Sequence, residues 1–148
     1  MSLLKYLTLE SVSADLQGTN KQEIIETLLD MLMLTGKVKD RSKALASLLD
    51  REQKMSTGME NGIAIPHGKT DAVDELVAAV GISKTPVDFQ ALDKQPSRIF
   101  IMTLSSIQRT GPHIQFLKEI SELLHSADMR SRLLAAREPR EILQIFAE

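Results

Sequence analysis

Apolar residues recur along this chain with two different spacings, and each spacing predicts a different kind of element. Between residues 20 and 34 they recur every three or four positions, which is typical of one buried face of a helix. Asn20 followed by Glu23 forms a capping pair at the start of this stretch. Asp40 caps a second predicted helix, which covers about residues 40–54.

Four other stretches predict strands. Residues 76–83 and 98–104 are almost entirely apolar, as in strands that are covered on both faces. Residues 63–65 form a shorter apolar run that Pro66 interrupts, and residues 7–9 alternate between apolar and polar positions. We therefore expect two long, buried strands and two short ones, the first of them near the N-terminus.

Helices are predicted again in the last third of the chain. Pro112 stands where a helix can begin, because the N–H group that proline lacks has no intrahelical partner there. This helix extends to about residue 126, and shorter ones follow at residues 129–136 and 139–146. Helices therefore alternate with buried strands, and no linker or repeat separates them. The pattern predicts a single α/β domain over residues 1–148, with a mixed β-sheet flanked by helices on both faces.

Composition and charge narrow the classes of partner. Of the 148 residues, 43% are hydrophobic and 26% are charged, which is typical of a globular chain. The formal net charge is −2, so we expect neither nucleic acid nor an anionic membrane as a partner. No apolar run approaches the ~20 residues of a membrane span, and the first residues do not resemble a signal peptide. We therefore expect no membrane insertion and a cytoplasmic protein. Cysteine is absent, which excludes disulfides and thiolate chemistry.

His67 is the first candidate for chemistry. It follows a predicted strand and lies between Pro66 and Gly68, in a position where α/β proteins often carry reactive groups. Pro66 restricts the backbone on one side, and Gly68 permits close approach of the backbone to a ligand. Spacing alone leaves an alternative open, since proline and glycine also flank many inert histidines in ordinary turns.

Two more residues are candidates because of the helix faces on which they fall. Arg51 is in register with Leu48 and Met55 on the inward side of its helix, where a guanidinium needs water or an anion. Alternatively, Arg51 lies there only because the C-terminal end of a helix favours a cation. His113 shares the apolar stripe of its own helix, in the first turn, and so points toward the core at its rim. His125 falls on the polar face of the same helix and is interpreted as a surface residue.

Together, His67, His113 and Arg51 predict a site for phosphoryl transfer. The N-terminus of the helix that carries His113 attracts anions and disfavours protonation of its imidazole. A guanidinium matches the oxygens of a phosphoryl group, and a neutral imidazole is a nucleophile. A zinc site is a weaker alternative, because no cysteine or short-range histidine pair anchors it, and a hydrolase would need a Gly-x-Ser-x-Gly motif. We expect no cofactor and no metal ion.

A longer part of the sequence resembles a known family. The motifs that carry the resemblance are Arg51-Glu52, Ser56-Thr57-Gly58, Asn61-Gly62-Ile63-Ala64-Ile65-Pro66-His67-Gly68-Lys69, Ala79-Val80-Gly81-Ile82, Asp88-Phe89, Asp93-Lys94-Gln95-Pro96 and Arg132-Leu133-Leu134-Ala135-Ala136. They resemble the enzyme IIA domains of the fructose/mannitol class of the bacterial phosphotransferase system. That family includes the nitrogen-related regulatory enzyme IIA, and the resemblance covers nearly the whole chain.

The resemblance implies roles that spacing alone does not. His67 would be the phosphorylated histidine, with phospho-HPr as donor, and Arg51 and His113 would match the arginine and the second histidine of the family's active site. The acceptor would be an enzyme IIB on another chain, as in fructose/mannitol-type sugar uptake. Alternatively, the protein would be regulatory and would bind a target protein according to its phosphorylation state. The implied activity is that of a phosphotransferase component, and the implied fold is the mixed sheet already predicted.

Overall fold

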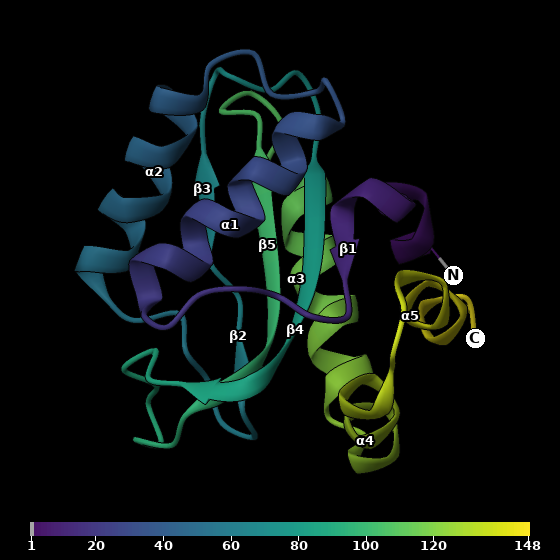
Figure 1. Ribbon diagram of the computed structural model, residues 1–148. Helices are drawn as coiled ribbons and strands as arrows, with labels where there is room; N and C mark the ends of the chain where they lie inside the picture. Colours follow the sequence, from purple (N-terminus) through teal and green to yellow (C-terminus); the bar gives the residue numbers. More distant parts are fainter. Residues whose placement is uncertain (1) are drawn as a thin grey trace.

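Five strands form one open, mixed sheet in the order β1-β4-β5-β2, and β3 pairs with the far end of β5 (Figure 1). The structure, a computed structural model, describes residues 2–148. The strands are β1 (Val12–Ser13), β2 (Ile63–Ala64), β3 (His67–Lys69), β4 (Val77–Val87) and β5 (Ser97–Ser105). Strands β4 and β5 are antiparallel, whereas β1, β2 and β3 each run parallel to the strand with which they pair. The predicted mixed sheet is confirmed.

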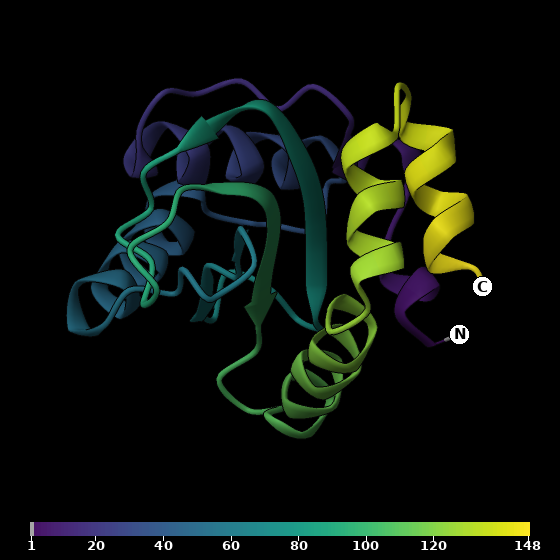
Figure 2. The same cartoon turned by 90° about the horizontal axis from the view of Figure 1, so that it is seen from below.

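The long strands are apolar throughout because helices cover both faces of the sheet. The helices of one face are α1 (Lys21–Leu34) and α2 (Arg41–Lys54), and those of the other are α3 (Gly111–Leu124), α4 (Ala127–Ala135) and α5 (Pro139–Phe146) (Figures 1 and 2). Adjacent residues of β5 enter different apolar clusters, so that Ile101 packs on the side of α3 and Met102 on the side of α1. This arrangement confirms the predicted α/β fold.

The N-terminal segment differs from the prediction. Residues 7–9 do not form a strand; two short 3-10 helices, η1 (Ser2–Tyr6) and η2 (Leu9–Ser11), precede β1. The Ser11 hydroxyl accepts a hydrogen bond from the backbone N–H of Thr8 at 2.9 Å. Such a local bond offers the backbone an alternative to strand pairing. The prediction of a strand at residues 7–9 is therefore wrong.

The two helices predicted in the first third of the chain begin at their predicted caps. The Asn20 side chain accepts from the backbone N–H of Glu23 at 2.9 Å, and the Asp40 side chain accepts from that of Lys43 at 3.1 Å. The return bond of the first pair is displaced by one residue, because the Glu23 carboxylate accepts from the backbone N–H of Thr19 at 2.8 Å. The side-chain oxygens thus satisfy backbone donors that a helix leaves unpaired at its start.

Strands β2 and β3 follow one path along β5 that is interrupted at Pro66. β2 pairs with residues 99–100 and β3 with residues 103–105. Proline is tolerated in an edge strand because it has no N–H to donate. Its carbonyl oxygen still accepts from the backbone N–H of Thr103 at 3.1 Å. His67 is therefore the first residue of β3, and strand pairing fixes its backbone at this edge of the sheet.

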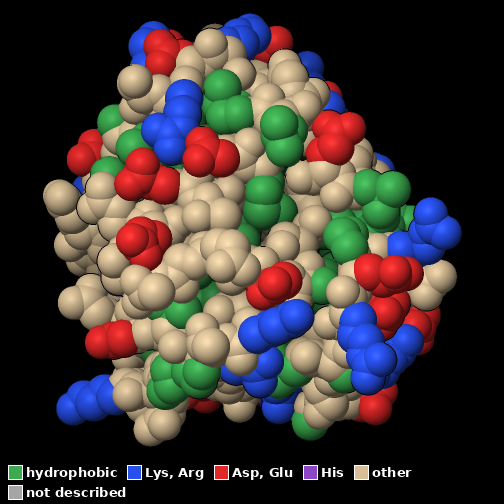
Figure 3. Space-filling model, viewed as in Figure 1, with side chains coloured by type: hydrophobic (Ala, Val, Ile, Leu, Met, Phe, Trp, Pro, Cys, Tyr) green, Lys and Arg blue, Asp and Glu red, His purple; other side chains and the backbone are tan. Residues whose placement is uncertain are grey.

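Charged side chains of both signs are mixed over the surface that Figure 3 shows. Arg41 of α2 forms ion pairs with Glu26 and Asp30 of α1, at 3.3 and 2.8 Å. Exposed pairs of this kind contribute only ~0–1 kcal/mol each, so the apolar clusters rather than these pairs hold the helices in place. Within residues 2–148, no helix is both long enough and apolar enough to span a membrane.

Candidate functional site

The three site residues predicted from the sequence come together beside β3. His67, His113 and Arg51 all line one open pocket of about 490 Å³. Its lining consists of Ser47, Asp50, Arg51 and Lys54 from α2, His67, Gly68 and Lys69 from β3, and His113 from α3. Three of these side chains are cationic and one is anionic, so the pocket has a net positive charge that suits an anion.

The imidazoles of His67 and His113 are neighbours in this pocket. Their ring centroids lie 5.3 Å apart, and the ring planes are tilted by 43°. His113 is only 5% exposed, which confirms its predicted direction toward the core, whereas His67 is half-buried. His67 is thus the ring that another molecule can reach, and His113 is the ring that lies deeper.

The backbone fixes which nitrogen of His67 carries a proton. Nδ1 lies 2.8 Å from the carbonyl oxygen of Ile65. A carbonyl oxygen only accepts hydrogen bonds, so Nδ1 carries the hydrogen and donates it. In the neutral ring, the lone pair is then on Nε2, the nitrogen available to attack an electrophile.

Several groups act on the protonation of His67. Burial lowers its pKa most, and the positive charges of Arg51 and Lys69 lower it as well. The hydrogen bond to Ile65 and the negative charge of Glu52 act in the opposite direction, but the net shift is downward. The ring is therefore neutral at pH 7, which is the state that a nucleophile requires.

His113 is neutral for a similar reason. Burial, followed by the charges of His67 and Lys69, lowers the pKa of His113 to about 4. The sequence indicated a neutral imidazole here because of the helix N-terminus, and the structure gives burial as the larger cause. Nδ1 of His113 lies 3.4 Å from the hydroxyl oxygen of Thr103, a buried residue of β5.

Arg51 fits both interpretations that the sequence left open, namely a guanidinium that faces an anion site and a cation at the C-terminus of a helix. One guanidinium nitrogen donates to the carbonyl oxygen of Met55 at 2.7 Å, just beyond the end of α2, and the side chain also lines the pocket. A cation is favoured at this end of a helix. The predicted inward register of Met55 is wrong: its side chain is 60% exposed, because α2 ends at Lys54 and Met55 is extended. The bond to Met55 holds the guanidinium in a defined position.

Sequence reasoning missed the role of Glu52, which is buried beside Arg51. Its carboxylate accepts from Lys21 Nζ at 2.8 Å, from the Thr57 backbone N–H at 2.8 Å and from the Thr57 hydroxyl at 2.6 Å. These bonds tie α1, the end of α2 and the loop after α2 together. The sequence could have indicated that Glu52 is buried, because it falls in the apolar stripe of α2, four residues after Leu48.

Lys69 lines the pocket and is another residue that the sequence reasoning did not single out for a role. It follows His67 by two positions in β3, and its side chain is exposed. Its charge lowers the pKa of both histidines. The signal that could have found it is the period of a strand, in which residues two apart point to the same side.

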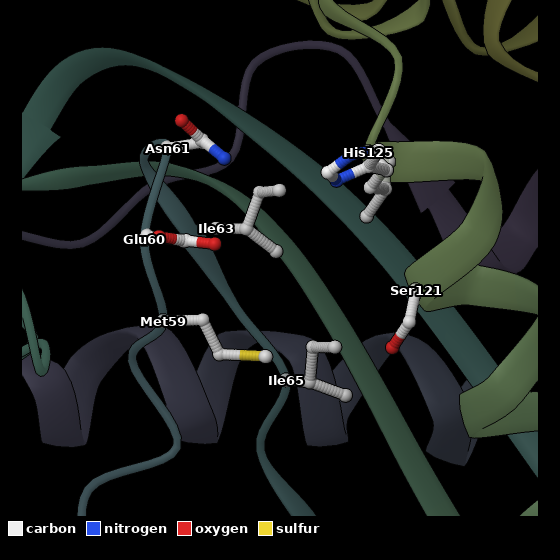
Figure 4. A pocket seen from close by; sticks show the side chains of 8 residues that line it. Met59, Glu60, Asn61, Ile63, Ile65, Ser121 and His125 are labelled. Carbon is white, nitrogen blue, oxygen red and sulfur yellow. The ribbon is translucent and has the colours of Figure 1, made fainter.

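A second hollow lies farther along the sheet, between β2 and the end of α3 (Figure 4). It has a volume of about 160 Å³ and is lined by Met59, Glu60, Asn61, Ile63, Ile65, Ser121, Leu124 and His125. His125 is exposed, as its place on the polar face predicted. None of His67, His113 and Arg51 lines this hollow.

The fold and the pocket define an α/β protein that presents a neutral imidazole in a positively charged pocket at the edge of its sheet. A model of the family "Phosphoenolpyruvate-dependent sugar phosphotransferase system, EIIA 2" matches residues 5–148. The chain belongs to this family, whose members are phosphotransferase components. The resemblance noted in the sequence is thereby confirmed.

Two relatives with different names illustrate the range of the family. The chain is 37% identical to the "PTS system fructose-specific EIIA component" of Haloferax volcanii over 140 residues, which are 95% of this chain and 91% of that protein. It is 31% identical to the "Nitrogen regulatory protein" of Pseudomonas aeruginosa over 131 residues, or 88% of this chain and 85% of that one. A sugar-specific and a regulatory protein are thus both similar to this chain.

Solved structures agree with the fold. The nitrogen regulatory protein IIA-Ntr from Neisseria meningitidis superimposes with a TM-score of 0.90 at 24% identity, over 98% of this chain and 99% of that chain. Enzyme IIA-mannitol of Escherichia coli, solved in complex with phosphorylated enzyme IIB-mannitol, gives a TM-score of 0.81 at 23% identity, over 95% and 96% of the two chains. The open sheet with helices on both faces is therefore the fold of enzyme IIA proteins.

Proposed function

We propose that this protein is a phosphohistidine carrier that accepts a phosphoryl group from phospho-HPr on Nε2 of His67 and passes it to an enzyme IIB on another chain. The observation that carries the proposal is the hydrogen bond from His67 Nδ1 to the Ile65 carbonyl. This bond leaves Nε2 with its lone pair in a pocket that Arg51 and His113 also line. Nucleophile, guanidinium and a second ring are the groups that phosphoryl transfer uses.

The transfer balances without a cofactor. Nε2 of His67 attacks phosphorus, an Nε2–P bond forms, and the P–N bond of the donor phosphohistidine breaks. The electron pair of that bond returns to the donor nitrogen, so each ring keeps the proton on its other nitrogen. On His67 that proton stays on Nδ1, where the Ile65 carbonyl accepts it. Transfer to the acceptor is the same displacement with the roles of nucleophile and leaving group exchanged.

Arg51 and His113 would stabilise the charge of the phosphoryl oxygens. Because the Met55 carbonyl holds the guanidinium of Arg51, its position is set before a phosphoryl group arrives. The Thr103 hydroxyl can donate to Nδ1 of His113, in which case the hydrogen of that neutral ring is on Nε2 and can be donated to an oxygen. Positioning and charge stabilisation of this kind supply most of the catalysis in phosphoryl transfer.

The relatives support the choice of partners. One is named a fructose-specific EIIA component, and the mannitol enzyme IIA was solved with phosphorylated enzyme IIB-mannitol. The resemblance to this class implies an enzyme IIB that accepts the group on a cysteine. The 148 residues of this chain contain no cysteine, so such an acceptor lies outside them.

A labelling reaction tests the proposal. With phosphoenolpyruvate, enzyme I and HPr, the wild-type protein should acquire an acid-labile phosphate, and His67→Ala should acquire none. His125→Ala is the matched control, because His125 is exposed and does not line the pocket with His67, and it should be labelled like the wild type. Label on His67→Ala would contradict the assignment. Addition of candidate enzyme IIB proteins then shows whether the phosphate moves onward and which acceptor takes it.

The nitrogen-related regulatory function is the second candidate, and the similarity to a nitrogen regulatory protein favours it. In this role, the phosphorylation state of His67 would control binding to a target protein such as a kinase or a transporter. Pull-down experiments with His67→Ala and with the charged His67→Asp distinguish the two functions. A regulatory protein should retain different partners in the two forms, and a sugar carrier should instead deliver phosphate to an enzyme IIB.

A further inference from the structure

We propose that Lys69 is a phosphoryl-binding residue, whose ammonium group follows the phosphoryl group as it arrives at and leaves His67. This inference rests on the proposed function of His67. It assigns to Lys69 a part distinct from that of Arg51, because the two cations are held in different ways.

The register of β3 places Lys69 on the same side as His67. Side chains two residues apart in a strand point to the same face. The residue between them, Gly68, lies against α2, where a Cβ atom would come within 2.6 Å of the Ser47 hydroxyl oxygen. His67 pairs with Thr103 of β5, and Lys69 pairs with Ser105. Lys69 thus lines the pocket of His67 one step closer to the end of the sheet.

Within residues 2–148, no carboxylate forms an ion pair with Lys69. Other lysines of this part of the molecule are paired: Lys39 with Asp74 at 2.5 Å, and Lys43 with Asp71 at 3.4 Å. The ammonium group of Lys69 is therefore available to an incoming anion. Of the two lysines that line the pocket, Lys69 is the one whose charge lowers the pKa of both histidines, which indicates proximity to both rings.

Arg51 and Lys69 differ in mobility. The guanidinium of Arg51 donates to the Met55 carbonyl at 2.7 Å, and this bond keeps it in place. Lys69 carries its charge on an exposed, flexible chain of four carbons and has three hydrogens to donate. During transfer, the phosphorus atom moves between two nitrogens while its oxygens invert. A fixed cation can match one end of this movement, and a mobile cation can remain in contact throughout it.

The role of Lys69 predicts an effect on the phosphoryl group itself. A nearby cation disfavours an added proton on the phosphorylated histidine, so it lowers the pKa that the ³¹P resonance follows. It also stabilises phosphorylated His67 relative to the free histidine. A lysine that is only a solvated surface charge would have neither effect, because water and salt screen it.

The test compares wild type, Lys69→Gln, Lys69→Arg and, as a control, Lys118→Gln. Lys118 is an exposed residue of α3 outside the pocket, so its replacement changes the net charge equally. Each protein is phosphorylated chemically with phosphoramidate, and the ³¹P resonance of the phosphohistidine is titrated with pH. The phosphorylated fraction at equilibrium with phospho-HPr is measured in parallel.

We expect Lys69→Gln to raise the ³¹P titration midpoint by about half to one unit. The equilibrium constant for transfer from phospho-HPr should fall about three- to tenfold. Lys69→Arg should restore most of both values, and Lys118→Gln should match the wild type. Equal midpoints for Lys69→Gln and wild type would overturn the inference about Lys69 and leave His67 as the carrier. Failure of wild-type His67 to take phosphate from either source would instead overturn the proposed function, and the inference with it.

Discussion

The ring of His113 lies behind that of His67, with 5.3 Å between the two centroids and 43° between the two planes. The deeper ring is almost fully buried and neutral at pH 7, and the outer ring is anchored through Nδ1 to the Ile65 carbonyl. Because His113 is neutral, it places no positive charge beside His67 that would make the lone pair on Nε2 less available. It can still donate one hydrogen bond to a phosphoryl oxygen, which is the basis of the first prediction.

Replacement of His113 by alanine should slow phosphoryl transfer to the acceptor by about 10²-fold, since one preorganised hydrogen-bond donor is lost. The same replacement should lower the free energy of unfolding by less than the activation free energy that this loss of rate represents. Rapid-quench transfer assays and urea denaturation measure the two quantities. Phe116→Leu is the control: it alters a buried residue of the same helix and should lower stability without slowing transfer. Parallel losses of rate and stability in His113→Ala would make His113 merely structural.

The pH dependence of stability should also report on His113. Its pKa is about 4 in the folded protein and 6.5 in the unfolded reference, so between these values the unfolded chain binds more protons. The free energy of unfolding should therefore fall as the pH is lowered from 6.5 toward 4. In His113→Gln, this fall should be smaller by about 1 to 3 kcal/mol, measured by urea denaturation at a series of pH values. Identical pH profiles for the two proteins would show that His113 does not titrate in this way.

Gly68 should tolerate no side chain, because β3 packs directly on α2 at this point. A Cβ atom there would lie 2.6 Å from the Ser47 hydroxyl oxygen and 3.1 Å from the Ser47 carbonyl carbon. Gly68→Ala should lower the free energy of unfolding by about 1 to 3 kcal/mol. Combination with Ser47→Ala should recover part of this loss by removing the nearest atom. Gly111→Ala serves as the control, since its Cβ would meet nothing within 4 Å. Equal stability of Gly68→Ala and Gly111→Ala would refute the close packing of β3 on α2.

Glu52 should contribute more to stability than any surface acid. Glu52 is 7% exposed, and its carboxylate accepts from Lys21 and twice from Thr57. Glu52→Ala leaves the backbone N–H and the hydroxyl of buried Thr57 without their acceptor and removes the ion pair of Lys21, which should cost about 2 to 4 kcal/mol. Asp74→Ala breaks an exposed ion pair with Lys39 and should change stability by less than about 1 kcal/mol. Comparable effects of the two replacements in urea denaturation would mean that water already solvates Glu52.

The elements that depend on local spacing were predicted well from the sequence. The caps at Asn20 and Asp40 lie where the helices begin, because a cap depends only on residues within one turn. The inward direction of His113 follows in the same way from the stripe of its own helix. The strand at residues 7–9 was mispredicted, since alternation over three residues does not distinguish a strand from a 3-10 turn.

What sequence reasoning could not supply are contacts between distant residues. Lys21 and Glu52 are far apart in the chain, and only the packing of α1 on α2 brings them to 2.8 Å. The convergence of Arg51, His67 and His113 was inferred from chemistry rather than from spacing. Their shared pocket shows that the three residues meet, and the proposed experiments test what they do there.

The place of His67 at the first position of an edge strand has a consequence for the order of events. Its backbone is paired with β5 and its Nδ1 is bonded to the Ile65 carbonyl, so in the proposed function Nε2 is presented at a single opening of the pocket. The donor and the acceptor must therefore bind at the same opening, so they cannot be bound at the same time. Turnover should accordingly follow ping-pong kinetics. In excess, the donor protein should inhibit competitively against the acceptor protein, and the acceptor against the donor.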